Sequence, residues 1–459
     1  MLGKNGLQAV SHEGKVMVLI AFGRRAKGMC NQKVRNRVVV MIGLISFMGL
    51  HGYSIQGWSQ EKIIKIGAHL PLSGGTAPTG ALNKEGIDFA VDIINNRYPD
   101  LTLPLAQTEG LPSFGGAKIK IVYADDRGDP NVAMAEVERL IQEEKVVAVI
   151  GGWESSCIKT GSLVSEKFRT PHISGAGSSV DLTTRGLKYY FRLIAHSGKV
   201  AKAYFDFLEE MEKKLGKKYN NIAIAYENTE YGSVANEHLE REIKERKYKL
   251  VASVPFYKGA TSLTSEVQKI KATKPDVLFQ IGYDPDAILF TKEMRNANFV
   301  PAVWFGMAGY TSPKYIPSVG NDGNGVLISG WFHSRFKKPV TLKVGELYRS
   351  RYGREMSIPV ALNFMSPIVA AEAINRAGST DKEAIRDALE KTKLTEEQSI
   401  MPGPGIWFTP VQPPPAHSHD NAGATMLIIQ IIDKKYEVVW PEKYKTGELI
   451  WPHPRWSEK

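Results

Sequence analysis

The first half of the chain alternates short apolar segments with longer segments of helical periodicity. Apolar and small residues alternate over 64–70 and lead into a Pro-Leu-Ser-Gly-Gly turn, and apolar residues then recur at helical spacing from Leu82 to Ile94. The same order predicts strands at 118–124, 146–150 and 171–174 and helices at 130–144 and 156–168. Such β-α repetition predicts a parallel sheet with helices on both faces.

The alternation begins again after residue 220. It predicts strands at 222–226, 250–256, 277–282 and 302–305 and helices at 232–245, 263–273 and 285–298. Beyond Gly325 it predicts another strand, then helices at 340–352 and 360–377, a third helix opened by the capping pattern at 380–383, a Pro-rich loop at 402–415, and strands at 426–432 and 436–440. Two sheets of this size predict an α/β protein with two lobes, and 189–197 is the expected first crossover.

Basic residues near the N-terminus directly precede a short apolar run. Lys33, Arg35 and Arg37 stand before 38–50, and small or polar residues follow at 54–59, which is the order of a secretory signal peptide. The run is shorter than the roughly 20 residues that cross a bilayer, and we expect no later segment to be long and apolar enough to span one. We therefore expect residues 1–59 to be a cleaved leader, with Met29 as an alternative start, and the mature protein to lie in the periplasm.

The net charge of +11 belongs mainly to this leader. Residues 1–59 contain eight basic and one acidic residue, whereas the remainder contains 51 basic and 47 acidic residues. The body of the protein is nearly neutral, so a nucleic-acid partner is not expected.

Motifs for catalysis or metal binding are weak. The segment 175–179 lacks the spacing of a nucleophile elbow, and 197–199 lacks the upstream glycine of a phosphate-binding loop. The run 417–420 contains two histidines and an aspartate, but we expect solvated loop residues there because a closed metal site needs about four ligands. Cys157 has no cysteine partner in the mature chain and is expected to be a packing residue. We expect neither an enzyme, nor a cofactor, nor a metal.

Small and hydroxyl-bearing residues recur where the predicted strands end. Ligands of open α/β sheets bind beyond the carboxyl ends of the strands, where the first N–H groups of helices are free. In the first sheet these positions hold Ser73, then Trp153 with Ser155, then Gly177 with Ser178, and in the second sheet they hold Tyr231, Tyr283 and Asp284. Such hydroxyl groups and free N–H groups favour a carboxylate ligand.

The order of several short motifs resembles the type I periplasmic binding proteins of the branched-chain amino acid group. The resemblance runs from about 61 to 440 and is carried by the segments 65–67, 71–74, 90–95, 125–126, 129–130, 149–151, 173–174, 182–186, 191–192, 231–232 and 275–276. It implies two Rossmann-like lobes joined by three crossovers, which close on a small ligand and dock on a membrane permease. On this basis lobe 1 is expected at 61–191 with 330–405, lobe 2 at 192–329 with 406–445, and a C-terminal tail at 446–459.

The resemblance also implies roles for individual residues. Ser155 corresponds to the family serine that holds the ligand carboxylate, and Gly177 with Ser178 to the pair that holds the amino and carboxylate groups. Tyr231 and Tyr283 correspond to residues that close over the ligand from the second lobe. Trp153 is an additional aromatic candidate beside Ser155.

One position departs from the family pattern. The branched-chain amino acid binders place an acidic residue where this sequence has Ala308. A buried ammonium without a counter-charge is costly. Either Asp284 supplies the charge, or the ligand has no α-amino group.

Three functions follow from these observations. The first is an exported, non-enzymatic receptor that supplies an amino acid or a related small carboxylate or amide to an ABC importer. The second is a sensor of the same fold that reports its ligand to a signalling partner. The third is a hydrolase, for which a nucleophile, base and acid at converging strand ends cannot be assembled.

Overall fold

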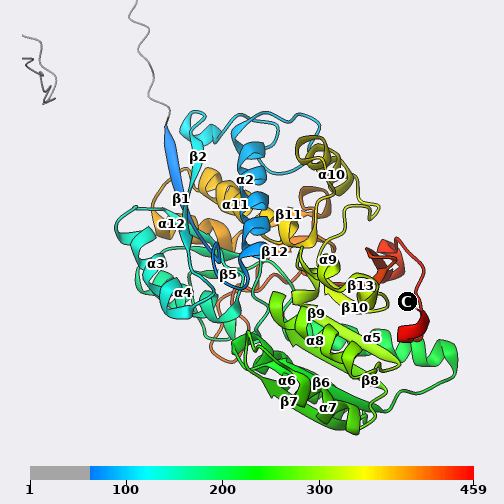
Figure 1. The fold of residues 1–459 in the computed structure, drawn as a ribbon. Coiled ribbons are helices and arrows are strands. Elements are labelled where there is room, and N and C mark those ends of the chain that lie inside the picture. The colour runs from blue at the N-terminus through cyan, green and yellow to red at the C-terminus, as the bar shows by residue number, and fades with distance from the viewer. Residues whose placement is uncertain (1–61, 459) are drawn as a thin grey trace, which may run out of the picture. The chain divides into compact units, whose positions relative to one another are not determined.

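A computed structural model describes residues 62–458 (Figure 1). The predicted signal peptide at 1–59 lies outside the described residues. Two main sheets and a two-stranded ladder contain the strands.

The first sheet has the strand order β2-β1-β3-β4-β5 and is parallel throughout. Its strands are β1 (Ile63–Leu70), β2 (Lys118–Asp125), β3 (Ala148–Gly151), β4 (His172–Ser174) and β5 (Tyr190–Arg192). It is accompanied by α2 (Ala77–Asn95), α3 (Pro130–Gln142), α4 (Ser155–Lys167), and α11 (Ile358–Ala377) from much later in the chain. Alternate residues of β1 serve opposite faces: Ile66 belongs to the main core, whereas Gly67 lies against Leu140 of α3. The predicted parallel sheet with helices on both faces is therefore confirmed.

The second sheet has the order β14-β13-β10-β9-β8-β6-β7 and is parallel except at β13 and β14. Its strands are β6 (Asn221–Glu227), β7 (Lys249–Phe256), β8 (Val277–Gly282), β9 (Val303–Ala308), β10 (Leu327–Gly330), β13 (Leu427–Ile432) and β14 (Lys435–Trp440). Its helices are α5 (Ser197–Leu215), α6 (Glu230–Glu245), α7 (Thr264–Ala272), α8 (Asp284–Asn296) and α9 (Tyr315–Val319). The pattern of the second half therefore forms a second sheet, as predicted.

The chain passes between the two sheets three times. It leaves the first sheet after β5, returns after β10, and leaves again before β13. The remaining elements are α10 (Pro339–Tyr352), α12 (Lys382–Glu390) and the ladder of β11 (Lys393–Thr395) with β12 (Gly405–Trp407). Residues near the C-terminus reach the second sheet, where the His453 N–H donates to the Ala302 carbonyl at 2.8 Å.

Some elements differ from the predicted ones. Helix α2 contains the predicted helical run from Leu82 to Ile94 but already begins at Ala77, because Pro78 opens its first turn. The predicted first crossover contains β5, and the Pro-rich loop contains β12. Only the end of α5 was predicted, from the lysine run at 213–218, although its buried residues Val200, Tyr204 and Leu208 recur at helical spacing.

The most apolar helix of the described chain is α11. It satisfies the length and hydropathy criteria for a membrane span, so the expectation that no later segment would do so was wrong. In the fold, however, 89% of its most apolar window is buried, and it packs against α2. Its apolar character is therefore explained by its position in the core.

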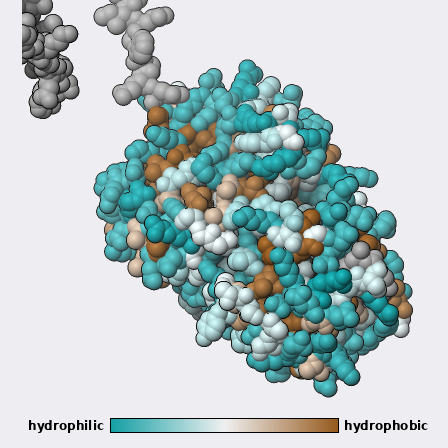
Figure 2. All heavy atoms as spheres, in the orientation of Figure 1, coloured by the Kyte–Doolittle hydropathy of each residue, from teal (hydrophilic) through white to brown (hydrophobic). Residues whose placement is uncertain are grey.

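Hydrophobic residues on the face shown in Figure 2 are scattered among hydrophilic ones. Exposed large side chains such as Met134 of α3, Leu163 of α4 and Tyr257 of the β7–α7 connection come from separate segments of the chain. Isolated apolar residues of this kind are normal for a protein surface.

Candidate functional site

Each sheet has a switch point, at which the order in which strands are added reverses. The candidate residues follow the strands at these points. In the first sheet, β1 leads outward to β2, and the chain then returns to add β3, β4 and β5 on the other side. In the second sheet, β6 leads to β7, and the chain then adds β8, β9 and β10 on the other side. Ligands of open α/β sheets bind outside the carboxyl ends of the strands at such points.

A cavity lies between the strand ends of the two sheets. It is small, with a volume of about 30 Å³. Seven of the nine predicted site residues line it: Trp153, Ser155, Gly177, Ser178, Tyr231, Tyr283 and Ala308. The structure thus brings together residues that are up to 155 positions apart in the sequence.

The first-sheet side of the cavity offers hydrogen-bond donors. Ser155 is the first residue of α4, where backbone N–H groups have no intrahelical acceptor. Its Oγ accepts a hydrogen bond from the Ser179 N–H at 3.3 Å, which leaves the hydroxyl hydrogen able to donate. Gly177 has a φ of +74°, and a Cβ there would lie 2.4 Å from Ile158, so this turn requires glycine. Donors at a helix start favour an anionic group.

The second-sheet side is aromatic. Tyr231 lies in the first turn of α6, and Tyr283 directly precedes α8. Their ring centroids are 5.5 Å apart, and the Tyr283 ring meets Trp153 edge-on at 6.4 Å. Burial raises the pKa of both phenols well above the usual value, so both hydroxyls are neutral. These rings form an apolar wall with polar tips.

Ala308 closes the cavity at the end of β9. Its φ of 50° and ψ of −82° lie outside the regions that residues with a Cβ normally occupy. The Thr311 hydroxyl donates to the Ala308 carbonyl at 2.9 Å and stabilises this turn. The side chain contributes only a methyl group, so this edge carries no charge.

Two predicted residues do not line the cavity. Ser73 is exposed, and its N–H donates to Asp125. Asp284 is buried, and its Oδ2 accepts from the Thr79 hydroxyl at 2.6 Å and the Ser312 hydroxyl at 2.9 Å. Burial raises the pKa of Asp284 to about 6. Asp284 therefore joins α2 to the second sheet instead of forming the wall.

Further polar contacts join the two sides around the cavity. Glu154 accepts hydrogen bonds from Lys258 of the β7–α7 connection and from the Thr76 hydroxyl. Lys159 of α4 pairs with Glu230 of α6 at 2.7 Å, and Glu230 also accepts from the Ser179 hydroxyl at 2.9 Å. Burial raises the pKa of Glu154 to about 7, against the attraction of Lys258. The two sides are thus held together by contacts that flank the cavity.

Five lining residues were not predicted from the sequence. They are Ala176, Ile194, Thr311, Trp331 and Leu362. Trp331 directly follows β10, so the strand-end rule that selected Ser155 and Tyr283 would also have selected it. Leu362 has no such signal, because it looks like any other core residue of α11.

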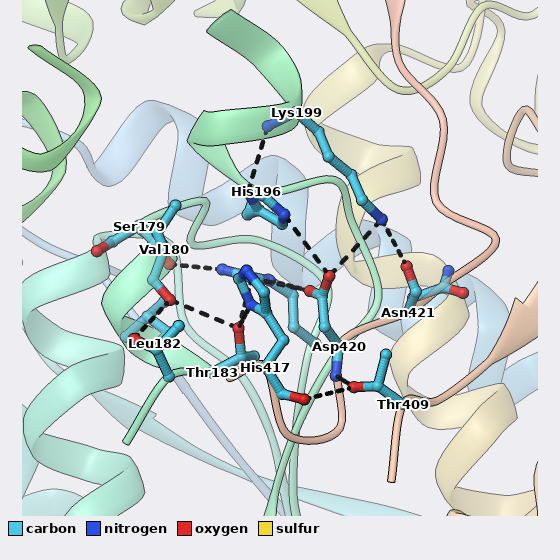
Figure 3. A network of polar contacts seen from close by, with 12 residues as sticks. Ser179, Val180, Leu182, Thr183, His196, Lys199, Thr409, His417, Asp420 and Asn421 are labelled. Carbon is cyan, nitrogen blue, oxygen red and sulfur yellow. Dashed lines mark hydrogen bonds and ion pairs between the residues drawn. The ribbon is translucent and has the colours of Figure 1, made fainter. Parts of the chain in front are cut away.

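A second polar cluster lies where the chain passes between the sheets (Figure 3). Asp420 accepts from Arg192 Nε at 2.8 Å and lies 3.7 Å from Lys199 Nζ. His196 and His417 stack with centroids 4.4 Å apart, and His196 Nδ1 accepts from the Lys199 N–H. The cluster holds the first and third passages of the chain together.

This cluster does not suit a metal ion, although His196, His417 and Asp420 lie close enough to share one. Arg192 and Lys199 already neutralise Asp420 and would repel a divalent cation. His419 faces elsewhere, stacked on Phe191 at 4.0 Å. The expectation of solvated loop residues here was wrong, because His419 and Asp420 are buried.

Four buried side chains beneath α4 form a chain of hydrogen bonds. Their residue types occur in catalytic sites, but their location does not suit catalysis. Asp126 bonds His69 at 2.9 Å, His69 lies 3.3 Å from His172, and His172 lies 3.3 Å from Ser165. All four side chains are at most 1% exposed, so a substrate has no access to them. Burial also raises the pKa of the Cys157 thiol far above its usual value, which opposes a nucleophilic role.

Comparison with known proteins identifies the fold and the family. The model of the family described as "Periplasmic binding protein" matches residues 63–427. The chain belongs to this family. The predicted resemblance to the branched-chain amino acid group is confirmed, and members of the family are solute-binding proteins.

Individual relatives agree with this assignment. The Leu/Ile/Val-binding protein homolog 7 of Brucella abortus is 26% identical over 402 residues, which cover 85% of this chain and 94% of the relative. A leucine-binding protein of Thermotoga maritima superposes with a TM-score of 0.70 at 22% identity, over 82% of this chain and 97% of its own. A solute-binding protein of R. palustris in complex with benzoate superposes with a TM-score of 0.67 at 16% identity, over 84% and 98%. The solved structures support the predicted α/β fold with parallel-rich sheets.

Proposed function

We propose that this periplasmic binding protein is exported and supplies an ABC importer with an amino acid or a related small carboxylate or amide. The observation that carries the proposal is the cavity between the two sheets, which is lined from both sides at the strand ends. Its donors suit a carboxylate, and its rings suit an apolar body. The family assignment supports the same reading, because relatives named as Leu/Ile/Val-binding protein homologues share most of their length with this chain.

Binding would proceed by closure of two lobes about the three passages of the chain. We propose the lobes at the boundaries expected from the sequence, 61–191 with 330–405 and 192–329 with 406–445. The contacts of Glu154, Glu230 and Asp284 would form as the lobes close. The closed protein would then dock on the permease, and catalysis has no part in this cycle.

Replacing Ser155 tests the carboxylate site. Ser155→Ala removes a hydroxyl donor at the start of α4, and we expect carboxylate binding to weaken by roughly 1–3 kcal/mol. Isothermal titration calorimetry on the mature protein, after a thermal-shift screen of amino acids, amides and small carboxylates, measures the change.

Ser156→Ala is the matched control, since Ser156 is the next residue of α4 and does not line the cavity. It should leave affinity unchanged. Equal affinity of the wild type and Ser155→Ala would remove Ser155 from the site, and a screen without any binding would contradict the proposed function.

A further inference from the structure

The cavity wall is entirely uncharged. Its lining side chains are aromatic, aliphatic, hydroxyl-bearing or glycine, and no lysine, arginine, histidine, aspartate or glutamate is among the described residues that line it. An α-amino acid enclosed here would place its ammonium group in a site without a counter-charge. Burying an unpaired charge in this way is costly.

The carboxylates near the cavity are already engaged. Glu154 pairs with Lys258, and Glu230 pairs with Lys159. Glu227 accepts from the backbone N–H of Gly232 and from the backbone and side chain of Thr229. The partners of Glu154 and Glu230 are cations, so these carboxylates add no net negative charge beside the ligand.

Asp286 accepts from the backbone N–H groups of Tyr283 and Gly259, which leaves Asp284 to be considered. Its Oδ2 accepts from Thr79 and Ser312, whereas its Oδ1 is buried without a partner among the described residues. It does not line the cavity, so a ligand ammonium would reach it only if the wall moved. Asp284 is therefore the residue to test as an alternative partner for a ligand ammonium.

Two indole N–H groups of the wall lack acceptors. Trp153 and Trp331 are each 6% exposed, and neither Nε1 has a hydrogen-bond partner among the described residues. A buried donor without an acceptor is unfavourable, and a ligand oxygen would relieve the cost. Both residues line the cavity, so their indole N–H groups, the Ser155 hydroxyl and the start of α4 would supply donors to an acceptor-rich, anionic ligand.

We infer that the ligand is a small carboxylate with an apolar body and no α-ammonium group. This inference rests on the proposed function and narrows its ligand class. The carboxylate would accept from Ser155 and from the indole N–H groups, and the body would pack against Tyr231, Tyr283 and Leu362.

Pairs of compounds that differ only in the ammonium group test this inference. The probes are 4-methylpentanoate against L-leucine and 3-phenylpropanoate against L-phenylalanine, titrated calorimetrically into the mature protein. We expect the member without the amino group to bind at least about tenfold more tightly in one or both pairs, since the amino acid must bury an unpaired charge. Tighter binding of an amino acid overturns the inference but leaves the proposed function intact. If no member of either pair binds, the carboxylate class itself is overturned.

A second test compares two variants of Ala308 that differ only in charge. Ala308→Asp and Ala308→Asn have the same shape, so the backbone strain at this position is common to both variants and cancels in the comparison. We expect the aspartate to weaken binding of the carboxylate probe at least about tenfold relative to the asparagine, because it places a like charge beside the ligand. Equal affinities of these two variants overturn the inference.

Asp284→Asn tests the alternative in which Asp284 holds a ligand ammonium. The asparagine oxygen still accepts from Thr79 and Ser312, and any effect on closure acts on both members of a probe pair alike, so the ratio of their affinities should stay within about threefold of the wild-type ratio. If the wild type binds an amino acid and Asp284→Asn does not, the inference is overturned and the ligand ammonium is assigned to Asp284. Trp331→Phe keeps an aromatic side chain but removes the N–H, and undiminished probe affinity in this variant would likewise contradict the inference.

Discussion

Asp284 shows how a single buried residue makes stability depend on pH. Its pKa is raised to about 6 by burial, from an ordinary value of 3.8. The neighbouring carboxyl of Asp286 acts in the same direction, whereas the hydroxyls of Thr79 and Ser312 oppose it. Between these two pKa values the folded protein keeps a proton that the unfolded chain releases, so the free energy of unfolding falls as pH rises.

Asp284→Asn should remove this part of the pH dependence. The asparagine oxygen accepts from the same two hydroxyls but does not titrate. From pH 4 to pH 6, the wild type should lose on the order of 2 kcal/mol of unfolding free energy relative to the variant. Urea unfolding at several pH values measures the difference. Asp100→Asn, at an exposed aspartate, is the control, and a constant difference between Asp284→Asn and the wild type would contradict this account.

At the residue scale, the sequence predicts most of the cavity wall. Ser155, Ser178 and Tyr283 were found because each lies within four residues of the end of a strand whose position is clear from the pattern. Asp284 follows Tyr283 equally closely, but its side chain bonds Thr79 and Ser312 instead of reaching the cavity. Which of two adjacent side chains enters a site depends on tertiary contacts that a sequence pattern does not contain.

At the scale of elements, the passages between the sheets depend on a buried ion pair. Arg192 at the end of β5 is fully buried and bonds Asp420 of the third passage, together with the Ser179 carbonyl and the Thr183 hydroxyl. The Asn421 side chain adds a bond to the Leu193 carbonyl at 2.8 Å. Two segments that are more than 200 residues apart in the sequence are thereby fixed to each other.

Asp420→Asn should destabilise the protein strongly. It leaves the Arg192 guanidinium buried without its counter-charge, and such losses cost about 3–5 kcal/mol. Denaturant unfolding followed by circular dichroism measures the change. Lys202→Ala breaks an exposed pair with Asp206 on α5 and should cost less than about 0.5 kcal/mol. Equal effects of the two variants would show that the Arg192 pair does not stabilise the passages.

The elements themselves were predictable to different degrees. Long strands and helices with clear periodicity, such as β1, β8 and α3, were predicted within a few residues. Strands of three residues are too short to show alternation: β4 was predicted because it follows a clear helix, whereas β5 and β12 were predicted as crossover and loop. Helix α11 is apolar on all sides because it is buried, so hydropathy alone does not distinguish it from a membrane span.

At the scale of the whole described molecule, the two sheets and the cavity between them form one functional arrangement. Each sheet supplies half of the wall, and neither half encloses a ligand alone. Glu154, Glu230 and Asp284 bond between the two sides beside the cavity, so in the proposed cycle closure and ligand enclosure would be coupled through the same elements. Such coupling is what a receptor needs in order to present its loaded form to a partner.

A crystal structure of the mature protein grown with 4-methylpentanoate tests the central claim most directly. We predict the ligand between the sheets, with its carboxylate bonded to Ser155 and its chain against Tyr231 and Tyr283. Ligand bound elsewhere, such as the open pocket beside His333 and Arg335, would contradict the account. So would a ligand between the sheets whose carboxylate makes no contact with Ser155.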